Sequence, residues 1–589
     1  MEESASRTNS CLIVLSYFFL PAPLEPLPGV LEKICLVPAV PKIRSTPNHL
    51  FNKIHNSFHD VKTFITGRFA LDTSPCIVIV RAPIFLQSAM KHIEGQPGGP
   101  TMKVQLAFAP ALSQSSFEVL AESMWPPLGV LYLAAFLRDK MPEIAIKVTD
   151  GCRIGFKETL REVDQFKPDI LGISFYTMTV YGASALARQI KKRFPGIIIV
   201  LGGPHVTALP VETLRESGAD FAVVGEGEEI FFQIVKTKAN GYPNRDIYAL
   251  PGVYGIEKFG SREIVHSNEA APFIQNLDSI PSPAWDLIDF SKYKGWFLSK
   301  QRPEATIFSA RGCPYGCTFC SNMVWKLSRP VLRLRSPENI ANEMEMLSRT
   351  YGIKEVFDQA DEFNNSYQHA LAVCAEIKRR SLGMTWKTQL RVKPFTEELA
   401  RAMAEAGCWY VHLGIESGNQ ETIDGIEKHI LLSDVEETCR LLKKYHIKVF
   451  ALFMLYNVWE KDGNLHYETS AMCLKTIQFA RSLFKRRLID YISWSVTTPY
   501  PGSKLYEIAG RHNLIRPELA NNWEAWQKDE LFMMSLPGIT RKEQGRMKFK
   551  GELLRVQGIL RNRAFKMKDI SFLAKRGSHI LIKSFLKRK

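Results

Sequence analysis

The chain has 589 residues, and at roughly 150 residues per domain this length predicts several domains and excludes a single small core. Hydrophobic residues make up 46% and charged residues 23% of the chain, which excludes a collagen-like, coiled-coil or wholly disordered protein. The longest apolar runs, residues 12–20 and 449–456, are shorter than the roughly 20 residues that cross a bilayer, so we expect no membrane span. The 11 cysteines are too sparse for a disulfide scaffold, and the N-terminus lacks a convincing signal peptide, which together predict a cytoplasmic protein.

The net charge of +16 is unevenly distributed along the chain. Residues 541–589 hold 16 Lys and Arg against 3 Asp and Glu, a balance of +13, and residues 1–101 hold 9 against 7, a balance of +2. These two balances leave +1 for the central residues 102–540. Because the basicity belongs to a tail, the sequence predicts no nucleic-acid partner for the central part.

Residues 1–101 hold 11 of the 33 prolines and end in residues 95–100, a run of Gly, Gln and Pro. This composition predicts a poorly structured extension. Met102 stands directly before an apolar, strand-like segment. A second interpretation is therefore that the native product begins at Met102.

Residues 102–240 alternate short apolar runs with helical stretches, which is typical of a doubly wound parallel sheet. The expected strands are residues 104–109, 144–149, 170–175, 197–201 and 221–224. Ligands of such sheets bind beyond the carboxyl ends of the strands, where glycines let the backbone approach a cofactor. The residues at these ends are Asp150, Ser174, Gly202, Gly203, Gly225, Glu226 and Gly227.

After an expected linker, residues 241–300, a second alternation runs through residues 301–510. The expected strands are residues 305–309, 355–358, 385–392, 409–415, 449–455 and 491–496. Six such units predict a partial (βα)6 barrel of the TIM type, with its chemistry at the carboxyl ends of the strands. The predicted fold is thus α/β: a Rossmann-like doubly wound parallel sheet, a partial barrel, and a basic helical C-terminal region, residues 511–589.

Two sets of side chains follow the first two barrel strands. Cys313, Cys317 and Cys320 stand on a glycine-containing loop with Cys-x3-Cys-x2-Cys spacing. Three thiolates from one loop can hold an iron–sulfur cluster and leave its fourth iron open, whereas structural zinc takes four ligands and no further Cys or His lies close by. After the second strand, we expect the carboxylates of Asp358, Asp361 and Glu362 either at the barrel cavity or in a solvated turn.

This loop, placed after the first strand of a partial barrel, resembles that of the radical S-adenosylmethionine superfamily. The resemblance implies that Cys313, Cys317 and Cys320 hold a [4Fe-4S] cluster, whose open iron chelates S-adenosylmethionine. One-electron reduction then cleaves S-adenosylmethionine to a radical that abstracts hydrogen. Such a reduction requires an electron donor such as flavodoxin or ferredoxin.

Residues 414–418 read Gly-Ile-Glu-Ser-Gly and look like a segment of that family in which the Glu holds the methionyl amino group, a role that the resemblance gives to Glu416. It also makes Gln389 and Arg391 candidates for contacts to the methionyl carboxylate or the ribose. The chain departs from the family after the fifth strand. Relatives usually have a Gly-x-Pro-Gly-Glu-like turn there, and residues 456–460 read Tyr-Asn-Val-Trp-Glu.

The barrel together with the upstream domain resembles the cobalamin-binding subfamily of these enzymes, over about residues 102–510. The resemblance implies cobalamin at the strand ends of the first domain. Where a classical cobalamin module has Asp-x-His-x-x-Gly, residues 150–155 place Cys152 at the histidine position. Cobalt is therefore expected to lack a lower histidine ligand.

The C-terminal tail mixes apolar with Lys and Arg residues. This mixture predicts either a peripheral contact with an anionic membrane, which would suit a lipid-like substrate, or a solvated helical cap. The leading functional hypothesis is methylation of an unactivated carbon or phosphorus centre in a small-molecule or lipid-like substrate. The alternative within the superfamily is a radical cyclase or rearrangement enzyme of the anaerobic magnesium-protoporphyrin IX monomethyl ester cyclase type, and an alternative of another class is a noncatalytic zinc and nucleic-acid-binding protein.

Overall fold

The computed structural model describes residues 102–112, 125–293, 298–321, 323–526 and 532–561. The chain divides after Gly99 into two units, and the second unit contains all of these residues. The predictions for residues 1–101, including a start at Met102, therefore lie outside the described residues. So does the tail after residue 561.

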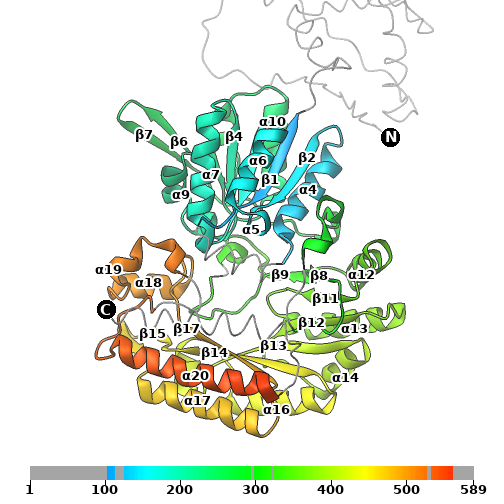
Figure 1. Cartoon of the computed structure of the whole chain (residues 1–589), viewed down its shortest axis with the longest axis vertical. Helices are drawn as coiled ribbons and strands as arrows, with labels where there is room; N and C mark the ends of the chain where they lie inside the picture. Colours follow the sequence, from blue (N-terminus) through cyan, green and yellow to red (C-terminus); the bar gives the residue numbers. More distant parts are fainter. Residues whose placement is uncertain (1–101, 113–124, 294–297, 322, 527–531, 562–589) are drawn as a thin grey trace, which may run out of the picture. The chain divides into compact units, whose positions relative to one another are not determined.

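The first domain is built on a seven-stranded sheet (Figure 1). Its strands are, in spatial order, β2 (Ala145–Asp150), β1 (Lys103–Phe108), β3 (Ile170–Ser174), β4 (Ile198–Gly202), β5 (Phe221–Val223), β6 (Val253–Phe259) and β7 (Arg262–Ser267). Strands β1 to β5 pair in parallel, and each overlaps the residues predicted for it. These pairings confirm the doubly wound sheet.

Helices cover both faces of this sheet because its strands alternate between two apolar cores. In β1, Leu106 packs into one core with α4 and α10, and Ala107 packs into the other with α6, α7 and α9. The helices of the domain are α4 (Leu128–Lys140), α5 (Gly151–Ile154), α6 (Phe156–Phe166), α7 (Val180–Arg193), α8 (Pro204–Ala208), α9 (Pro210–Ser217), α10 (Glu228–Ala239) and α11 (Asn244–Tyr248).

The prediction of a linker over residues 241–300 is wrong for residues 253–267. Strand β6 pairs antiparallel with β5, and β7 pairs antiparallel with β6, so both strands extend the first sheet. Most side chains of β7 are exposed, and β6 is buried only at its start. The sequence of this edge hairpin therefore lacks the alternation of apolar and polar residues that reveals a half-buried strand.

The second sheet has six parallel strands whose spatial order is their order in the chain, which is the arrangement of an open barrel. They are β8 (Glu304–Ile307), β11 (Glu355–Asp358), β12 (Thr385–Leu390), β13 (Cys408–Glu416), β14 (Lys448–Leu455) and β17 (Tyr491–Val496). The barrel helices are α12 (Pro337–Tyr351), α13 (Tyr367–Arg380), α14 (Glu397–Glu405), α15 (Gln420–Gly425), α16 (Leu432–Lys444) and α17 (Ser470–Lys485). The predicted partial barrel is confirmed.

Two short hairpins stand beside the barrel. Strands β9 (Ala310–Arg311) and β10 (Arg333–Leu334) pair antiparallel around the cysteine loop. Strands β15 (Val458–Lys461) and β16 (Asn464–Tyr467) pair antiparallel after β14. Helix α18 (Lys504–Arg511) ends the barrel part. In the described part of the predicted helical C-terminal region, α20 (Arg541–Arg561) is the one long helix, whereas residues 512–526 and 532–540 contain the short α19 (Pro517–Ala520), a 3₁₀ turn and an isolated bridge between Ile515 and Met534.

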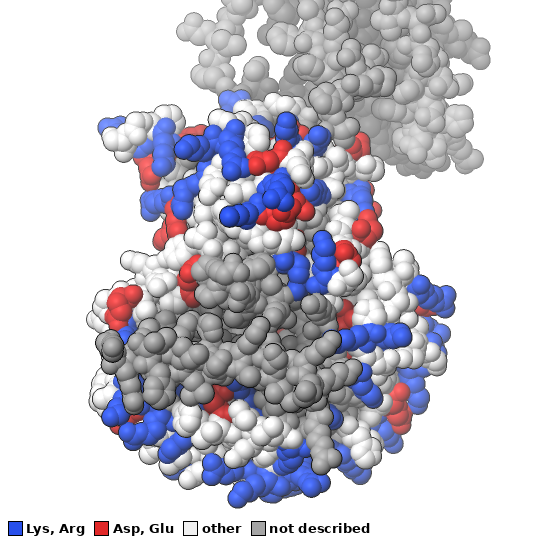
Figure 2. All heavy atoms as spheres, viewed as in Figure 1, with Lys and Arg blue, Asp and Glu red and all other residues white. Residues whose placement is uncertain are grey.

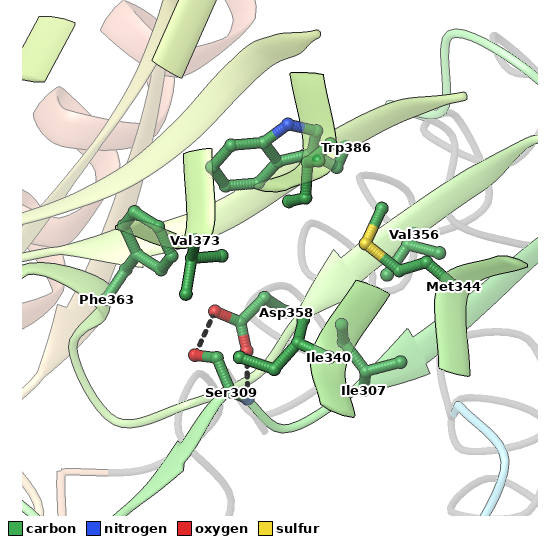
Figure 3. A pocket seen from close by; sticks show the side chains of 10 residues that line it. Ile307, Ser309, Ile340, Met344, Val356, Asp358, Phe363, Val373 and Trp386 are labelled. Atoms are coloured by element: carbon green, nitrogen blue, oxygen red, sulfur yellow. Dashed lines mark hydrogen bonds between the residues drawn. The ribbon is translucent and has the colours of Figure 1, made fainter. Parts of the chain in front are cut away.

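Asp358 points away from the barrel lumen, into the layer between the strands and helices α12 and α13 (Figure 3). Its carboxylate accepts hydrogen bonds from the backbone N–H and the hydroxyl of Ser309, at 2.9 and 2.6 Å, and from the hydroxyl of Thr388 at 3.3 Å. The void beside it measures about 10 Å³, too small for a ligand. Neither expectation for Asp358 is correct, because it joins β8, β11 and β12 from outside the lumen.

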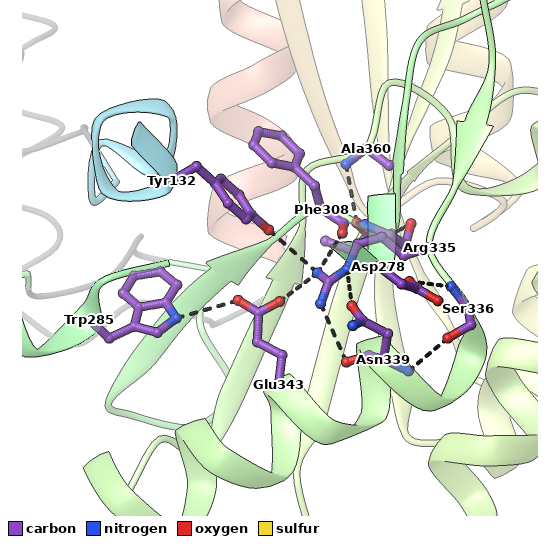
Figure 4. A network of polar contacts seen from close by, with 11 residues as sticks. Tyr132, Asp278, Trp285, Phe308, Arg335, Ser336, Asn339, Glu343 and Ala360 are labelled. Atoms are coloured by element: carbon purple, nitrogen blue, oxygen red, sulfur yellow. Dashed lines mark hydrogen bonds and ion pairs between the residues drawn. The ribbon is translucent and has the colours of Figure 1, made fainter. Parts of the chain in front are cut away.

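A buried polar network joins the two domains (Figure 4). Arg335 forms an ion pair of 2.5 Å with Glu343 of α12 and donates to the hydroxyl of Tyr132 in α4, at 3.5 Å. The indole N–H of Trp285, from the segment between the domains, donates to the other Glu343 oxygen at 3.4 Å. Leu131 and Tyr132 also share an apolar core with the barrel, so α4 packs in both domains.

Figure 2 shows the charged residues on one face of the molecule. On the face that Figure 2 shows, Lys and Arg stand among Asp and Glu over the described residues, in keeping with the balance of +1 for residues 102–540. None of the helices in the described part of the chain has the length and hydropathy of a membrane span.

Candidate functional site

The cysteine loop follows β9 and turns sharply at Gly312. This glycine has φ 95°, and a Cβ there would meet the carbonyl oxygen of Val331 at 1.8 Å, so no larger residue fits. The loop is fixed from two sides, because the N–H of Thr318 donates to the carbonyl of Ile426 at 3.0 Å and the carbonyl of Thr318 accepts from Leu505 at 2.8 Å. The backbone thus holds the loop at the carboxyl ends of the barrel strands.

All three cysteines of the loop line one cavity of about 140 Å³ in the barrel. Cys317 is buried, and Cys313 and Cys320 are half-buried. The cavity is also lined by Tyr315, Phe319, Asp361, Glu362, Gln389, Leu390, Arg391, His412, Gly414, Glu416, Lys428 and Leu452. The structure therefore brings together the three predicted cluster ligands and the three predicted S-adenosylmethionine contacts.

The donor set fits an iron–sulfur cluster better than a mononuclear metal. Among the described residues, no three His, Cys, Asp or Glu side chains are placed to share one metal ion. A zinc ion requires such convergence, whereas each thiolate of a cubane cluster binds a different iron. Burial raises the pKa of the Cys313 thiol to about 11.

Glu416 reaches the cavity because the end of β13 leaves regular strand geometry. Its φ is 68°, and the pairing of β13 with β14 shifts register between Gly414 and Glu416. Such backbone costs about 1–3 kcal/mol for a residue other than glycine and is typical of functional sites. A Cβ at position 414 would meet the Glu416 carboxylate at 2.7 Å, so Gly414 provides the space that this side chain fills.

Lys428 is a cavity residue that the sequence analysis missed. Its ammonium lies 3.1 Å from the Glu416 carboxylate, and both side chains are buried. Burial alone would lower the pKa of Lys428, but Glu416 and Glu362 raise it, so the ammonium stays charged. A carboxylate and an ammonium side by side are complementary to the ammonium and carboxylate of an amino acid. Lys428 lies in the loop after α15, outside any motif that the sequence showed.

Arg391 contacts the cysteine loop at Tyr315 and Cys317. Its guanidinium lies 3.5 Å from the centre of the Tyr315 ring, and Nη1 lies 3.9 Å from Cys317 Sγ. Its Nη2 donates to the carbonyl of Lys428. Arg391 therefore lines the cavity predicted for S-adenosylmethionine, but its guanidinium already contacts other residues of the protein. Gln389 lines the cavity, with its amide N–H donating to Ala360 at 3.5 Å.

Asp361 and Glu362 line the cavity, unlike Asp358. Burial raises the pKa of Asp361 to about 6 and that of Glu362 to about 7, the latter despite the nearby Lys428 and Arg391. Of the two alternatives expected for Asp361 and Glu362, the barrel cavity is therefore correct and the solvated turn is not.

The unusual turn after β14 keeps the backbone geometry that favours glycine. Tyr456 has φ 62°, in the left-handed region. Glu468 directly follows the hairpin β15–β16. Its buried carboxylate accepts from the Ser417 hydroxyl at 2.7 Å and from the side chain and backbone N–H of Asn457, both at 3.1 Å. Glu468 thereby ties the residue after Glu416 to the turn that follows β14.

In the first domain, the predicted glycines lie at the carboxyl ends of the strands. A Cβ at Gly202 would meet nothing within 4 Å, so this backbone borders open space. Gly203 has φ 103° and packs against the carbonyl of Phe175, directly after Ser174 of β3. Gly225, with φ 93°, follows β5. In a sheet of order 2-1-3-4-5 this edge lies next to the switch point between β1 and β3, and the open space beside Gly202 fits a bound cofactor.

Two of the residues predicted to contact cobalamin are engaged elsewhere. Asp150 accepts a hydrogen bond from the Tyr293 hydroxyl at 2.8 Å. Glu226 forms ion pairs with Arg311 and Arg333 of the β9–β10 hairpin. Cys152, at the position of the missing histidine, is 1% exposed and its thiol donates to the carbonyl of Ala109 at 3.1 Å. Its thiol therefore points into the protein.

Two family models match the chain in the order of its domains. The B12 binding domain matches residues 119–235, and the radical SAM superfamily matches residues 307–463. An uncharacterized methyltransferase of Pyrococcus horikoshii is 32% identical over 428 residues, which are 72% of this chain and 86% of that protein. The chain belongs to the radical S-adenosylmethionine superfamily. As a radical S-adenosylmethionine enzyme with a B12 binding domain, it uses a [4Fe-4S] cluster, S-adenosylmethionine and cobalamin, as the sequence predicted.

This radical S-adenosylmethionine enzyme has two further similarities. The anaerobic magnesium-protoporphyrin IX monomethyl ester cyclase of Rubrivivax gelatinosus is 29% identical over 391 residues, 66% of this chain and 66% of that protein. The structure of TsrM, a radical S-adenosylmethionine methyltransferase of Kitasatospora setae with cobalamin and a [4Fe-4S] cluster bound, matches with a TM-score of 0.55 at 19% identity, over 71% of this chain and 79% of that one. The second similarity shows a shared fold.

Proposed function

We propose that this radical S-adenosylmethionine enzyme transfers a methyl group to an unactivated carbon or phosphorus centre of a small molecule. The observation that carries the proposal is the union of a B12 binding domain and a three-cysteine barrel cavity in one compact unit. The methyltransferase relative that spans most of the chain supports methyl transfer over other radical chemistry.

When bound, the cluster and S-adenosylmethionine supply hydrogen abstraction, and cobalamin supplies a methyl group. The chain's own residues bind and orient these groups. Cys313, Cys317 and Cys320 would hold the cluster. The carboxylate of Glu416 and the ammonium of Lys428 would bind the ammonium and the carboxylate of S-adenosylmethionine. The glycines after β4 and β5 would let cobalamin approach the backbone of the first domain.

Anaerobic reconstitution tests the proposal. The reconstituted enzyme is incubated with S-adenosylmethionine and candidate substrates, and the products are measured by mass spectrometry. Methylated product with S-adenosylhomocysteine supports methyl transfer. If 5′-deoxyadenosine forms with a cyclised or rearranged product and no methylation, the cyclase alternative is correct, which the similarity to the Rubrivivax gelatinosus cyclase favours.

An electron donor and a cellular location also belong to this proposal. The cluster requires an electron, for which a flavodoxin or ferredoxin is the expected donor. A cytoplasmic location is part of the proposal, because 11 cysteines in 589 residues are too sparse for a disulfide scaffold.

A peripheral membrane contact is also part of the proposal. Helix α20 exposes an apolar stripe on one face, made of Phe549, Leu553, Val556 and Leu560, which are 47–69% exposed. The 28 residues after this helix contain 9 Lys and Arg against 1 Asp. An apolar stripe that continues into a basic segment suits an anionic membrane surface and a lipid-like substrate.

A further inference from the structure

The cysteine loop is framed by a hairpin whose two arginines reach into the first domain. Arg311 of β9 stands two residues before Cys313 and pairs in register with Arg333 of β10. Arg311 Nη1 lies 2.9 Å from the Glu226 carboxylate, and Nη2 lies 2.6 Å from Glu228. Arg333 Nη1 lies 2.7 Å from the other oxygen of Glu226. We call these four residues the interdomain clamp.

The clamp is buried and enclosed by aromatic rings. All four of its side chains are between 2% and 9% exposed. The guanidinium of Arg311 lies 5.2 Å from the centre of the Tyr132 ring in α4, and that of Arg333 lies 4.3 Å from the centre of the Phe273 ring. Glu226 keeps its charge there: burial raises its pKa, but the two arginines outweigh burial and lower it overall.

Stability alone does not account for such a cluster. Replacing a buried ion pair by apolar residues of similar volume is often neutral or stabilising, because the charges lose their hydration. A bidentate arginine, in contrast, fixes distance and orientation between two segments. Here one segment is the loop after β5, which carries the glycines expected near cobalamin, and the other is the hairpin that begins the cysteine loop.

We propose that the interdomain clamp positions the cysteine loop relative to the cobalamin-binding edge of the first domain. The inference rests on the proposed function and deepens it. Glu226 and Glu228 act as positioning residues for the neighbouring domain, and Glu226 makes no contact to cobalamin. The Gly-Glu-Gly-Glu motif at residues 225–228 thus has divided roles: its glycines border the cofactor edge, and its carboxylates hold the hairpin.

The test compares Glu226→Gln, Glu228→Gln and Arg311→Lys with Glu229→Gln in the full-length holoenzyme. Glu229 is a matched control, since it carries the same charge on the next residue of α10 but is exposed. Arg311→Lys keeps the positive charge and loses the fork that reaches both carboxylates. The readouts are amide hydrogen exchange of residues 312–321, cobalamin affinity, and the ratio of methylated product to 5′-deoxyadenosine.

The three clamp variants are expected to exchange amide hydrogens in residues 312–321 roughly tenfold faster, because each breaks part of a buried ion pair. Cobalamin affinity should stay within about twofold of the unmodified enzyme. The ratio of methylated product to 5′-deoxyadenosine should fall, since hydrogen abstraction no longer aligns with the methyl donor. The control variant should leave all three unchanged.

A loss of cobalamin affinity in Glu226→Gln with unchanged exchange in the cysteine loop would overturn the inference, as it would identify Glu226 as a cofactor contact. Faster exchange throughout both domains would also overturn it, because the clamp would then serve general stability. Hydrogen exchange does not depend on methyl transfer. If the unmodified enzyme makes no methylated product but the exchange result holds, the proposed function fails and the positioning role stands.

Discussion

At the scale of single residues, the site depends on charges that the fold holds out of water. Glu416 and Lys428 stabilise each other inside the barrel, and the strained backbone of Glu416 brings its carboxylate into the cavity. A strained residue persists only where the surrounding structure fixes it, and here the space left by Gly414 permits the contact. We propose that this pair binds the amino acid end of S-adenosylmethionine.

The Glu416→Gln variant is expected to bind S-adenosylmethionine about 10- to 100-fold more weakly, because a hydrogen bond to a charged group contributes about 1.5–3 kcal/mol. It should also lower thermal stability, as Lys428 is left buried beside a neutral amide. Glu421→Gln, which removes an exposed carboxylate of α15, is the control. Equilibrium binding to the reconstituted enzyme measures the effect, and unchanged affinity in Glu416→Gln would contradict the assigned role.

At the scale of elements, the cysteine loop is shaped by its own backbone and by what it packs against. Gly312 turns the chain against the backbone of Val331, just before β10, and the segment after α15 and the start of α18 hold the middle of the loop. The sequence revealed the three cysteines through their spacing. It did not reveal the hairpin β9–β10 around them, because its strands are two residues long and carry no periodicity.

Replacing Gly312 by Ala tests this packing. The new methyl group would overlap the Val331 carbonyl, so we expect the loop to shift and the cluster content to fall to less than about half after reconstitution. Gly383→Ala is the control: it has a similar positive φ of 66°, but a Cβ there meets nothing within 4 Å. Iron and sulfide per chain are the measurement. Equal cluster content in both variants would show that the close contact has no role.

At the scale of the whole molecule, the C-terminal region connects the barrel to both the first domain and the surface. The backbone N–H of Trp523 donates to the Tyr181 hydroxyl of α7 at 3.3 Å, and the Trp523 ring packs edge-on against His205 of α8. The chain thus returns to the carboxyl edge of the first sheet. Helix α20 then packs its other face on β17 and α17 and exposes its apolar stripe.

The exposed stripe of α20 predicts binding to anionic vesicles. Leu560→Glu should reduce the bound fraction roughly tenfold, because it removes an apolar side chain worth about 1.5–3 kcal/mol when buried. Gln557→Glu adds the same charge at an exposed polar position of α20 and serves as the control. Co-sedimentation with vesicles with and without anionic lipid is the measurement. Binding that does not depend on anionic lipid, or that both variants reduce equally, argues against a membrane contact through the stripe.

The sequence by itself determined the two α/β domains and the three cysteines. The periodicity of a strand or helix depends on which of its own residues are buried, and the cysteine spacing belongs to one short loop. Both can therefore be recognised from one segment of the sequence. The tertiary structure alone decided which charges meet: Lys428 beside Glu416, Asp358 outside the lumen, and Glu226 in the clamp with arginines about 85 and 107 residues away. These pairings join different segments that are 12 to 107 residues apart, and the sequence around a buried charge does not identify its partner.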